Sequence, residues 1–210
     1  MSGIPVDKFA WWIFGYQKFS EEIIRHCICH AKGWEDITGA VKTKQPTEIM
    51  SHAKNRPDWH SDLEFLRKRA CDLLDNRRKA IALDAAFLDG DQIVIGEFKS
   101  WGGFEKPHDP ATLRKEVRAG KWFPDRFAIH SVLYRKEERP VSRFVFATGL
   151  KGATSDVFQV GDLDVEVIDI PSLLKDSVKA LPEHKEEWFR ALDDAVKKVK
   201  TYVETGAIPR

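Results

Sequence analysis

Two apolar segments separated by Asp89-Gly90-Asp91 are the feature that most constrains how this chain folds. Residues 92–98 are rich in β-branched and aromatic side chains, residues 81–88 are almost entirely apolar, and Asp-Gly-Asp is typical of a tight turn. The pattern predicts a β-hairpin. Apolar strands rarely carry charge, yet three charged residues stand within these segments: Asp84, Glu97 and Lys99.

The spacing places the three charges on one face of the predicted hairpin. Side chains alternate between the two faces of a strand, so Glu97 and Lys99 point the same way. A two-residue loop of Gly90-Asp91 sets Asp84 directly across from Glu97. A two-residue loop that starts at Asp89 instead sets Asp84 diagonal to Glu97. Either loop leaves the three charges on one face, whereas a three-residue loop would break this arrangement. Directly opposed Cβ atoms lie about 5 Å apart.

Two carboxylates at that separation repel each other, and a hard divalent cation held by their oxygens removes the repulsion. A neighbouring ammonium group can then hold a phosphate oxygen or steady an attacking hydroxide. These groups together are suited to metal-assisted cleavage of a phosphodiester bond.

The residues that carry this pattern are Asp84 and then Glu97-Phe98-Lys99, on consecutive strands. They resemble the signature of the PD-(D/E)XK nuclease superfamily, which has the restriction-endonuclease-like fold. Leu83 stands where the family name has proline. The resemblance implies that Asp84 and Glu97 hold Mg²⁺ (or Mn²⁺). It also implies that Lys99 orients or helps deprotonate the attacking water and stabilises the developing charge.

A helix is predicted over residues 6–32, because apolar side chains recur there at three- and four-residue steps, and Gly33 ends it. In the superfamily an early helix often contributes a glutamate to the metal site. The resemblance therefore implies Glu22 as a further catalytic residue, with Glu21 and Glu64 as the alternatives. The alternative for Glu22 is a solvated carboxylate near the N-terminus of a helix, without a catalytic role.

Ser61 is predicted to open a helix that continues to about Asn76, and Ser61-Asp62-Leu63-Glu64 fits a capping box. Residues 44–57 lack a clear period and are bracketed by prolines. The predicted buried side of the Ser61 helix carries Leu63, Leu66, Ala70 and Leu73.

Further elements are predicted in the second half of the chain. Strands are expected at residues 127–134 and 142–148, on either side of a charged loop at 135–140, and at 164–170 near a sheet edge. Helices are expected from Asp109-Pro110 to about Ala119, at 171–180 and at about 182–205.

The helix that starts at Asp109-Pro110 offers a contact surface for DNA phosphates. Basic residues outnumber acidic ones from Lys99 to Lys151, whereas residues 152–170 carry only acidic charges. A basic, solvated face is the alternative reading. The predicted phosphate contacts are Arg114, Lys115, Arg118 and Lys121.

The composition of the chain predicts its number of domains, its relation to membranes and its location. With 210 residues, 42% hydrophobic and 32% charged, the chain is expected to form a single domain at residues 1–210. It contains no long apolar run, so no membrane association is expected. Three cysteines and the lack of a secretory leader predict a cytoplasmic protein. The amphipathic helix at 182–205 is expected to dock on its own core, with a homodimer as the alternative.

The sequence thus predicts an α/β protein with a central mixed β-sheet flanked by helices, restriction-endonuclease-like by resemblance. The predicted function is a Mg²⁺-dependent endonuclease acting on DNA in restriction, repair or a mobile element. Two alternatives are a non-catalytic nucleic-acid-binding or assembly module on the same fold, and an interaction protein whose hairpin charges have no chemical role.

Overall fold

The computed structural model describes residues 21–59, 61–99, 109–149 and 154–180. The chain divides into two compact units. Residues 34–170 form one, called here the sheet unit, and residues 1–33 and 171–210 form the other. The first part of the predicted N-terminal helix and the predicted helix at 182–205 lie outside the described residues.

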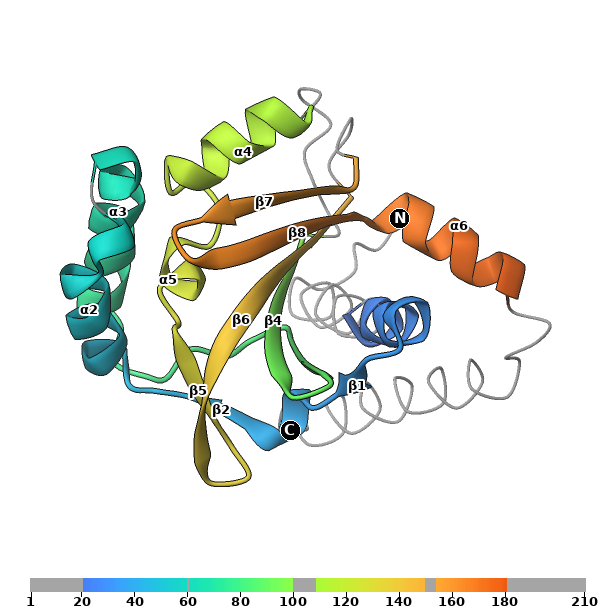
Figure 1. Ribbon diagram of the computed structural model, residues 1–210, viewed down its shortest axis with the longest axis horizontal. Coiled ribbons are helices and arrows are strands. Elements are labelled where there is room, and N and C mark those ends of the chain that lie inside the picture. The colour runs from blue at the N-terminus through green and yellow to red at the C-terminus, as the bar shows by residue number, and fades with distance from the viewer. Residues whose placement is uncertain (1–20, 60, 100–108, 150–153, 181–210) are drawn as a thin grey trace, which may run out of the picture. The chain divides into compact units, whose positions relative to one another are not determined.

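The sheet unit has the mixed α/β architecture that the sequence predicts, with a curled sheet flanked by helices (Figure 1). The strands are β1 (Glu35–Asp36), β2 (Val41–Thr43), β3 (Ala85–Asp89), β4 (Gln92–Lys99), β5 (Ser131–Tyr134), β6 (Glu137–Thr148), β7 (Asp156–Val160) and β8 (Leu163–Asp169). The helices are α2 (Pro46–Asn55), α3 (Glu64–Asp75), α4 (Pro110–Arg118) and α5 (Pro124–Phe127), with 3₁₀ turns at Thr38–Ala40, Pro57–Trp59 and Ser61–Leu63.

The sheet combines antiparallel and parallel pairs. β4 lies between β3, its antiparallel hairpin partner, and β6, which is parallel to it. The long strand β6 pairs along its first part with antiparallel β5 and along its second part with parallel β8. β1, β2 and β7 each pair with a single strand and complete the sheet. β4 therefore has a strand on each side, and its side chains are screened from solvent along most of its length.

The hairpin of β3 and β4 has the first of the two predicted registers. Asp89 pairs with Gln92, so the loop is Gly90-Asp91, and Gly90 has the positive φ of 58° that this turn requires. Ala85 pairs with Gly96 at the other end. Continuing that register by one residue sets Asp84, which precedes β3, opposite Glu97.

One face of the sheet packs against α2, α3 and α5 (Figure 1). Alternation along the strands directs every second apolar residue to this side, and the helices supply the matching surface. From the sheet this core contains Ala86, Ile93, Ile95, Phe144 and Phe146; from the helices it contains Ile49, Leu66, Leu74 and Phe127.

The helix α2 was not predicted. Only Pro46, Ile49 and Ala53 are buried along its ten residues, so its apolar stripe is too thin to stand out in the sequence. Its start is nevertheless well specified, because Pro46 occupies the first turn and Gln45 with Glu48 forms a capping box.

The predicted start of the next helix is wrong in detail. Residues Ser61–Leu63 form a 3₁₀ turn, Leu63 is the N-cap of α3, and no side chain caps the helix. The predicted residues Leu63, Leu66 and Ala70 are buried, and Leu74 completes the buried side of the helix. Leu73, predicted to be buried, is 47% exposed.

The second half of the chain contains more regular structure than predicted. The expected loop at residues 135–140 is only a two-residue turn, in which Arg135 (φ 51°) and Lys136 (φ 70°) both have positive φ. The charged residues that follow belong to β6. The strand predicted at 127–134 begins only at Ser131, after the short helix α5, and β7 was not predicted. β8 lies beside the edge strand β7, near the sheet edge as expected.

Three predicted helices are confirmed. In the terminal unit, residues 21–32 are helical, and Gly33 with φ 70° follows the last turn. The helix α6 spans Ile170–Ala180. In the sheet unit, α4 begins after Asp109, whose carboxylate accepts a hydrogen bond from the Thr112 amide at 3.0 Å.

Candidate active site

Asp84 and Glu97 come together at the open end of the β3–β4 hairpin. Asp84 Oδ2 accepts a hydrogen bond from the backbone N–H of Phe98 at 2.9 Å, which fixes Asp84 against β4. Asp84 is half-buried, and only 2% of Glu97 is exposed. The hairpin register, set by the turn at the far end of the two strands, is what juxtaposes these two acids.

Glu97 has a strongly perturbed acidity. Burial, and then the nearby charge of Asp84, raise its pKa from 4.5 to about 8. The charge and hydrogen bond of Arg126 act against these effects without cancelling them. Glu97 therefore binds a proton tightly in the folded protein, as expected of a buried carboxyl group beside a second acid.

Arg126 is the residue at this site that sequence reasoning missed. Its Nε donates to Glu97 Oε1 at 3.1 Å, and its Nη1 donates to Asp125 Oδ2 at 2.7 Å. Arg77 Nη2 lies 2.9 Å from the same Asp125 oxygen. Asp125 is 1% exposed. The result is a continuous chain of alternating charges from Glu97 to Arg77.

The helix α5 brings Asp125 and Arg126 to the site. Phe123, with φ 45° and ψ 43°, turns the chain, and Pro124 starts the helix. Phe127 anchors it, since its ring centroid lies 4.2 Å from that of Phe144 on β6. A signal was present in the sequence: Asp125-Arg126 interrupts an apolar segment, as Asp84 and Glu97 do in the hairpin.

Lys99 is the last residue of β4 and is exposed. It lies two positions after Glu97 and so on the same face of the strand. Among the described residues, Lys99 makes no ion pair with either hairpin carboxylate. The parity predicted for the three charges agrees with the backbone, and the charges of Asp84, Arg126 and Asp125 all act on Glu97.

Among the described residues, no group of three His, Cys, Asp or Glu side chains could hold a metal ion, and the third carboxylate stays a prediction. Glu22 lies in the helix at 21–32 and forms an ion pair with Arg25, one turn further on. Its neighbour Glu21 is buried. Glu64 is largely exposed on α3, and its Oε1 lies 3.8 Å from Arg67 Nη2.

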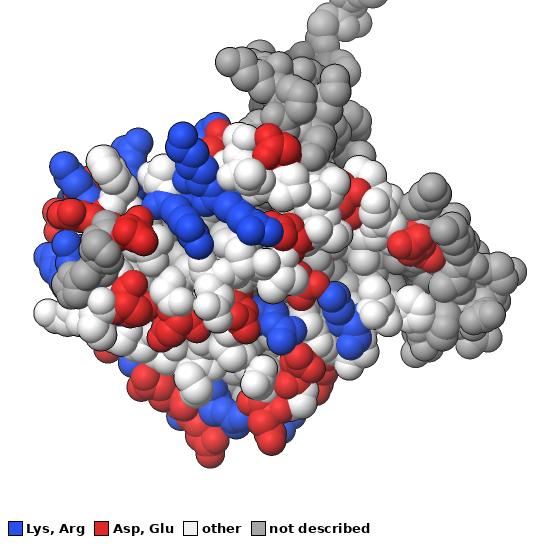
Figure 2. Space-filling model, turned by 45° about the horizontal axis from the view of Figure 1, so that its top comes forward, with Lys and Arg blue, Asp and Glu red and all other residues white. Residues whose placement is uncertain are grey.

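The helix α4 carries the predicted DNA contacts. Arg114, Lys115 and Arg118 line a hollow of about 610 Å³ at the start of the helix. Figure 2 shows Lys and Arg side chains gathered on the face that carries α4, with acidic side chains around them.

Not all of these cations are equally available to a phosphate. Arg114 binds Asp156 of β7 through two hydrogen bonds, and Lys121 pairs with Glu116. Arg118 makes a longer contact, 3.4 Å, with the Gln159 carbonyl. Lys115 is exposed and has no ion pair with the described residues. Lys115 and Arg118 are therefore the better candidates for phosphate contact.

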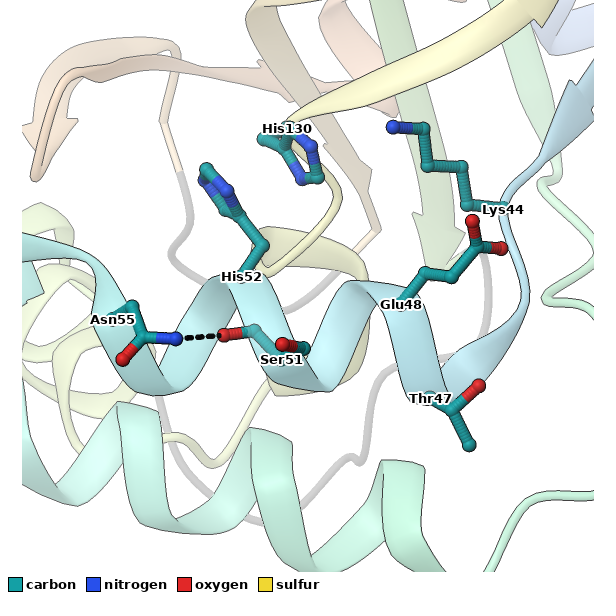
Figure 3. A pocket seen from close by; sticks show the side chains of 7 residues that line it. All are labelled: Lys44, Thr47, Glu48, Ser51, His52, Asn55 and His130. Atoms are coloured by element: carbon teal, nitrogen blue, oxygen red, sulfur yellow. Dashed lines mark hydrogen bonds between the residues drawn. The ribbon is translucent and has the colours of Figure 1, made fainter.

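A second polar hollow of about 540 Å³ lies between α2, the end of β2 and the segment before β5 (Figure 3). The rings of His52 and His130 stack across it with centroids 3.5 Å apart and an interplanar angle of 16°. Burial, and then the neighbouring His52, lowers the pKa of His130 to about 4. The residues around it are Lys44, Thr47, Glu48, Ser51, His52, Asn55 and His130.

This second hollow is poorly built for a metal ion. Lone pairs of parallel, stacked imidazoles lie in separate planes and do not converge on one centre. The carboxylate of Glu48 is turned to the amide of Gln45, 3.0 Å away. The site on β4 is therefore the stronger candidate for chemistry.

Comparison of the chain with protein-family models, with curated proteins and with solved structures gives no match. No helix among the described residues is both long and apolar enough to cross a membrane.

Proposed function

We propose that this protein is a metal-dependent nuclease that hydrolyses phosphodiester bonds of DNA, with Mg²⁺ or Mn²⁺ as its cofactor. The observation that carries the proposal is the buried Glu97 opposite Asp84, with a pKa raised to about 8 by burial and by that neighbour. Such a pair of oxygen donors matches the preference of a hard divalent cation. Asp84 and Glu97 are therefore the residues that would hold it.

The arrangement of the sheet supports the restriction-endonuclease-like fold that the resemblance implies. The two carboxylates lie on an antiparallel hairpin whose second strand, β4, continues into a parallel pair with β6. Helices cover the face of the sheet on which Glu97 lies. We extend the proposal to a cytoplasmic endonuclease of restriction, repair or mobile-element type, with a homodimer as a further expectation.

The protein's own groups have separate tasks in this proposal. A bound Mg²⁺ supplies Lewis-acid chemistry at the scissile phosphate. Asp84 and Glu97 orient the ion, and the hydrogen bond from Phe98 to Asp84 holds one of these ligands rigid. Lys99, exposed at the end of β4, orients the attacking water and stabilises negative charge as the bond breaks. Lys115 and Arg118 hold the DNA backbone.

A second candidate function is a non-catalytic nucleic-acid-binding module. It is favoured by the ion pair between Arg126 and Glu97, because a carboxylate neutralised by an internal arginine needs no metal. On that reading, the charges at the end of the hairpin stabilise the fold.

The two candidates differ in a direct experiment. Supercoiled plasmid and linear duplex are incubated with the wild type, with and without Mg²⁺ or Mn²⁺. Cleavage should require the ion and disappear in Asp84→Asn and Glu97→Gln. Matched controls are Asp91→Asn, in the turn of the same hairpin, and Glu137→Gln, both at exposed positions, which should keep full activity. A wild type that neither binds the ions nor cleaves DNA would rule out the nuclease and leave the non-catalytic alternatives.

A further inference from the structure

The guanidinium of Arg126 is shared between two buried carboxylates. Nε–H donates to Glu97 and Nη1–H donates to Asp125, and both acceptors are almost completely buried. Charge-assisted hydrogen bonds of this kind are among the stronger polar interactions in proteins. Arg126 is thus the described cation closest to the carboxylate that the proposed metal ion needs.

The two contacts of Arg126 differ in how they depend on a metal ion. The contact with Glu97 uses Oε1 of a proposed metal ligand, so a cation at that oxygen would replace it. The contact with Asp125 lies outside the carboxylate pair. Asp125 is additionally held by Arg77 at 2.9 Å and therefore stays in place when Glu97 changes partner.

We propose that Arg126 is an exchangeable counter-ion of Glu97. Without metal it donates to Glu97 Oε1 and is the counter-ion of Glu97 wherever that carboxyl is ionised. When a divalent cation binds Asp84 and Glu97, Asp125 retains the guanidinium beside the site, and the released Nε–H binds a phosphate oxygen of the nucleic acid. This inference rests on the proposed metal-dependent function. It assigns to Arg126 a contact with a nucleic-acid phosphate that forms only when metal is bound. This contact is separate from the roles of Lys99 and of the α4 cations.

Metal binding without nucleic acid is the first test. Mg²⁺ binding is measured by calorimetry at pH 9, where protons compete least for Glu97, with wild type, Arg126→Gln and Arg77→Gln. Removing the internal competitor should tighten binding by about tenfold, the scale of one hydrogen bond to a charged group. Arg77→Gln is the matched control: it also removes a guanidinium from Asp125 but makes no contact with Glu97, so its affinity should equal that of wild type.

Nucleic-acid binding is the second test. Affinity for a short duplex is measured against salt concentration, in Ca²⁺ and separately in EDTA. With Ca²⁺, Arg126→Gln should lower the log–log salt slope by about 0.9, the value for one lost phosphate contact on duplex DNA. In EDTA the slope should not change, because Arg126 is then occupied by Glu97. If Arg126→Gln does not fold, Arg126→Met provides the same comparison, since it also removes the positive charge and keeps a long unbranched side chain.

The outcomes separate this inference from the proposed function. A wild type that binds no divalent cation overturns both. A wild type that binds Mg²⁺ and cleaves DNA, while Arg126→Gln has equal or weaker Mg²⁺ affinity, overturns the exchange alone. A salt slope reduced equally in Ca²⁺ and in EDTA would also overturn it, because Arg126 would then contact phosphate whatever its partner.

Discussion

Glu97 should make the stability of the folded protein fall as pH rises, and Glu97→Gln should remove that dependence. The carboxyl group has a pKa of 4.5 when unperturbed and about 8 in the folded protein. Between those values the unfolded chain is ionised while the folded chain keeps its proton. The folded state therefore binds more protons, and the free energy of unfolding decreases with pH until about pH 8. The amide of the Glu97→Gln variant has no proton to lose in this range.

The size of the effect follows from the shift in pKa. One unit corresponds to about 1.4 kcal/mol, so the shift from 4.5 to about 8 means that ionised Glu97 destabilises the folded state by at most about 5 kcal/mol at pH 9. Rearrangement around the charge lowers this figure, and a difference of about 2 kcal/mol between pH 5 and pH 9 is a reasonable expectation. The variant also loses the Arg126 contact, but Arg126 keeps Asp125 as a partner.

The assay is urea denaturation of wild type and Glu97→Gln in EDTA from pH 5 to pH 9. The difference between their free energies of unfolding should grow in favour of the variant as pH rises. Glu137→Gln, at an exposed position at the start of β6, should differ from wild type by a constant amount. A pH-independent difference for Glu97→Gln would refute the reasoning that Glu97 carries an uncompensated charge. Adding Mg²⁺ at pH 9 should restabilise wild type and leave the variant unchanged.

Three further predictions concern other charged groups. Lys99→Ala should bind Mg²⁺ at least as tightly as wild type in calorimetry yet lose cleavage, because its contribution belongs to the transition state; a variant that still cleaves contradicts this. Lys115→Gln and Arg118→Gln should each lower the salt slope of duplex binding by about 0.9. Arg114→Gln should change the salt slope less, since that side chain is already in an ion pair. Salt slopes equal to that of wild type in all three variants would mean that these side chains do not contact DNA phosphates. His130 should lower the free energy of unfolding of the wild type by about 1 to 2 kcal/mol as pH falls from 6.5 towards 4, because only the unfolded chain gains a proton there. The ring is partly exposed, so solvent makes this effect smaller than the full shift in pKa would give. In urea denaturation the His130→Asn variant should not show this decrease. Parallel pH profiles of the free energy of unfolding for wild type and variant would contradict the lowered pKa of His130.

Local sequence signals were sufficient for the hairpin and for several helix ends. Asp89-Gly90-Asp91 restricts the loop to a few possibilities, and alternation then fixes which side chains share a face. Asp109 before Pro110 likewise specifies the start of α4. The sequence could not choose between the two hairpin registers, because Asp89-Gly90-Asp91 allows a two-residue loop at either of two positions.

Short elements stabilised by distant contacts were not predictable in this way. α5 has four residues, too few to display a helical period, and it is held by the packing of Phe127 on Phe144. β7 has five residues, and its pairing with β8 defines it. The contact between Arg126 and Glu97 spans 29 positions, and no spacing rule connects residues so far apart.

A more general rule would nevertheless have led from Glu97 to Arg126. A charge within an apolar segment is buried when the segment folds, and a buried charge without a partner is too costly to persist. In the described sheet unit the three most buried charged residues, Arg56, Glu97 and Asp125, each have an oppositely charged neighbour.

A charged residue within one apolar segment therefore predicts a residue of opposite charge within another apolar segment that packs beside it. Asp84 and Glu97 are both negative, so the partner segment had to supply a cation, and Asp125-Arg126 is the only such interruption between the predicted α4 helix and the following strand. The pKa of Glu97 stays raised even with Arg126 in place, so the compensation is incomplete. A divalent cation bound by the two carboxylates would offset both causes of the raised pKa, the burial of Glu97 and the charge of Asp84, independent of any family resemblance.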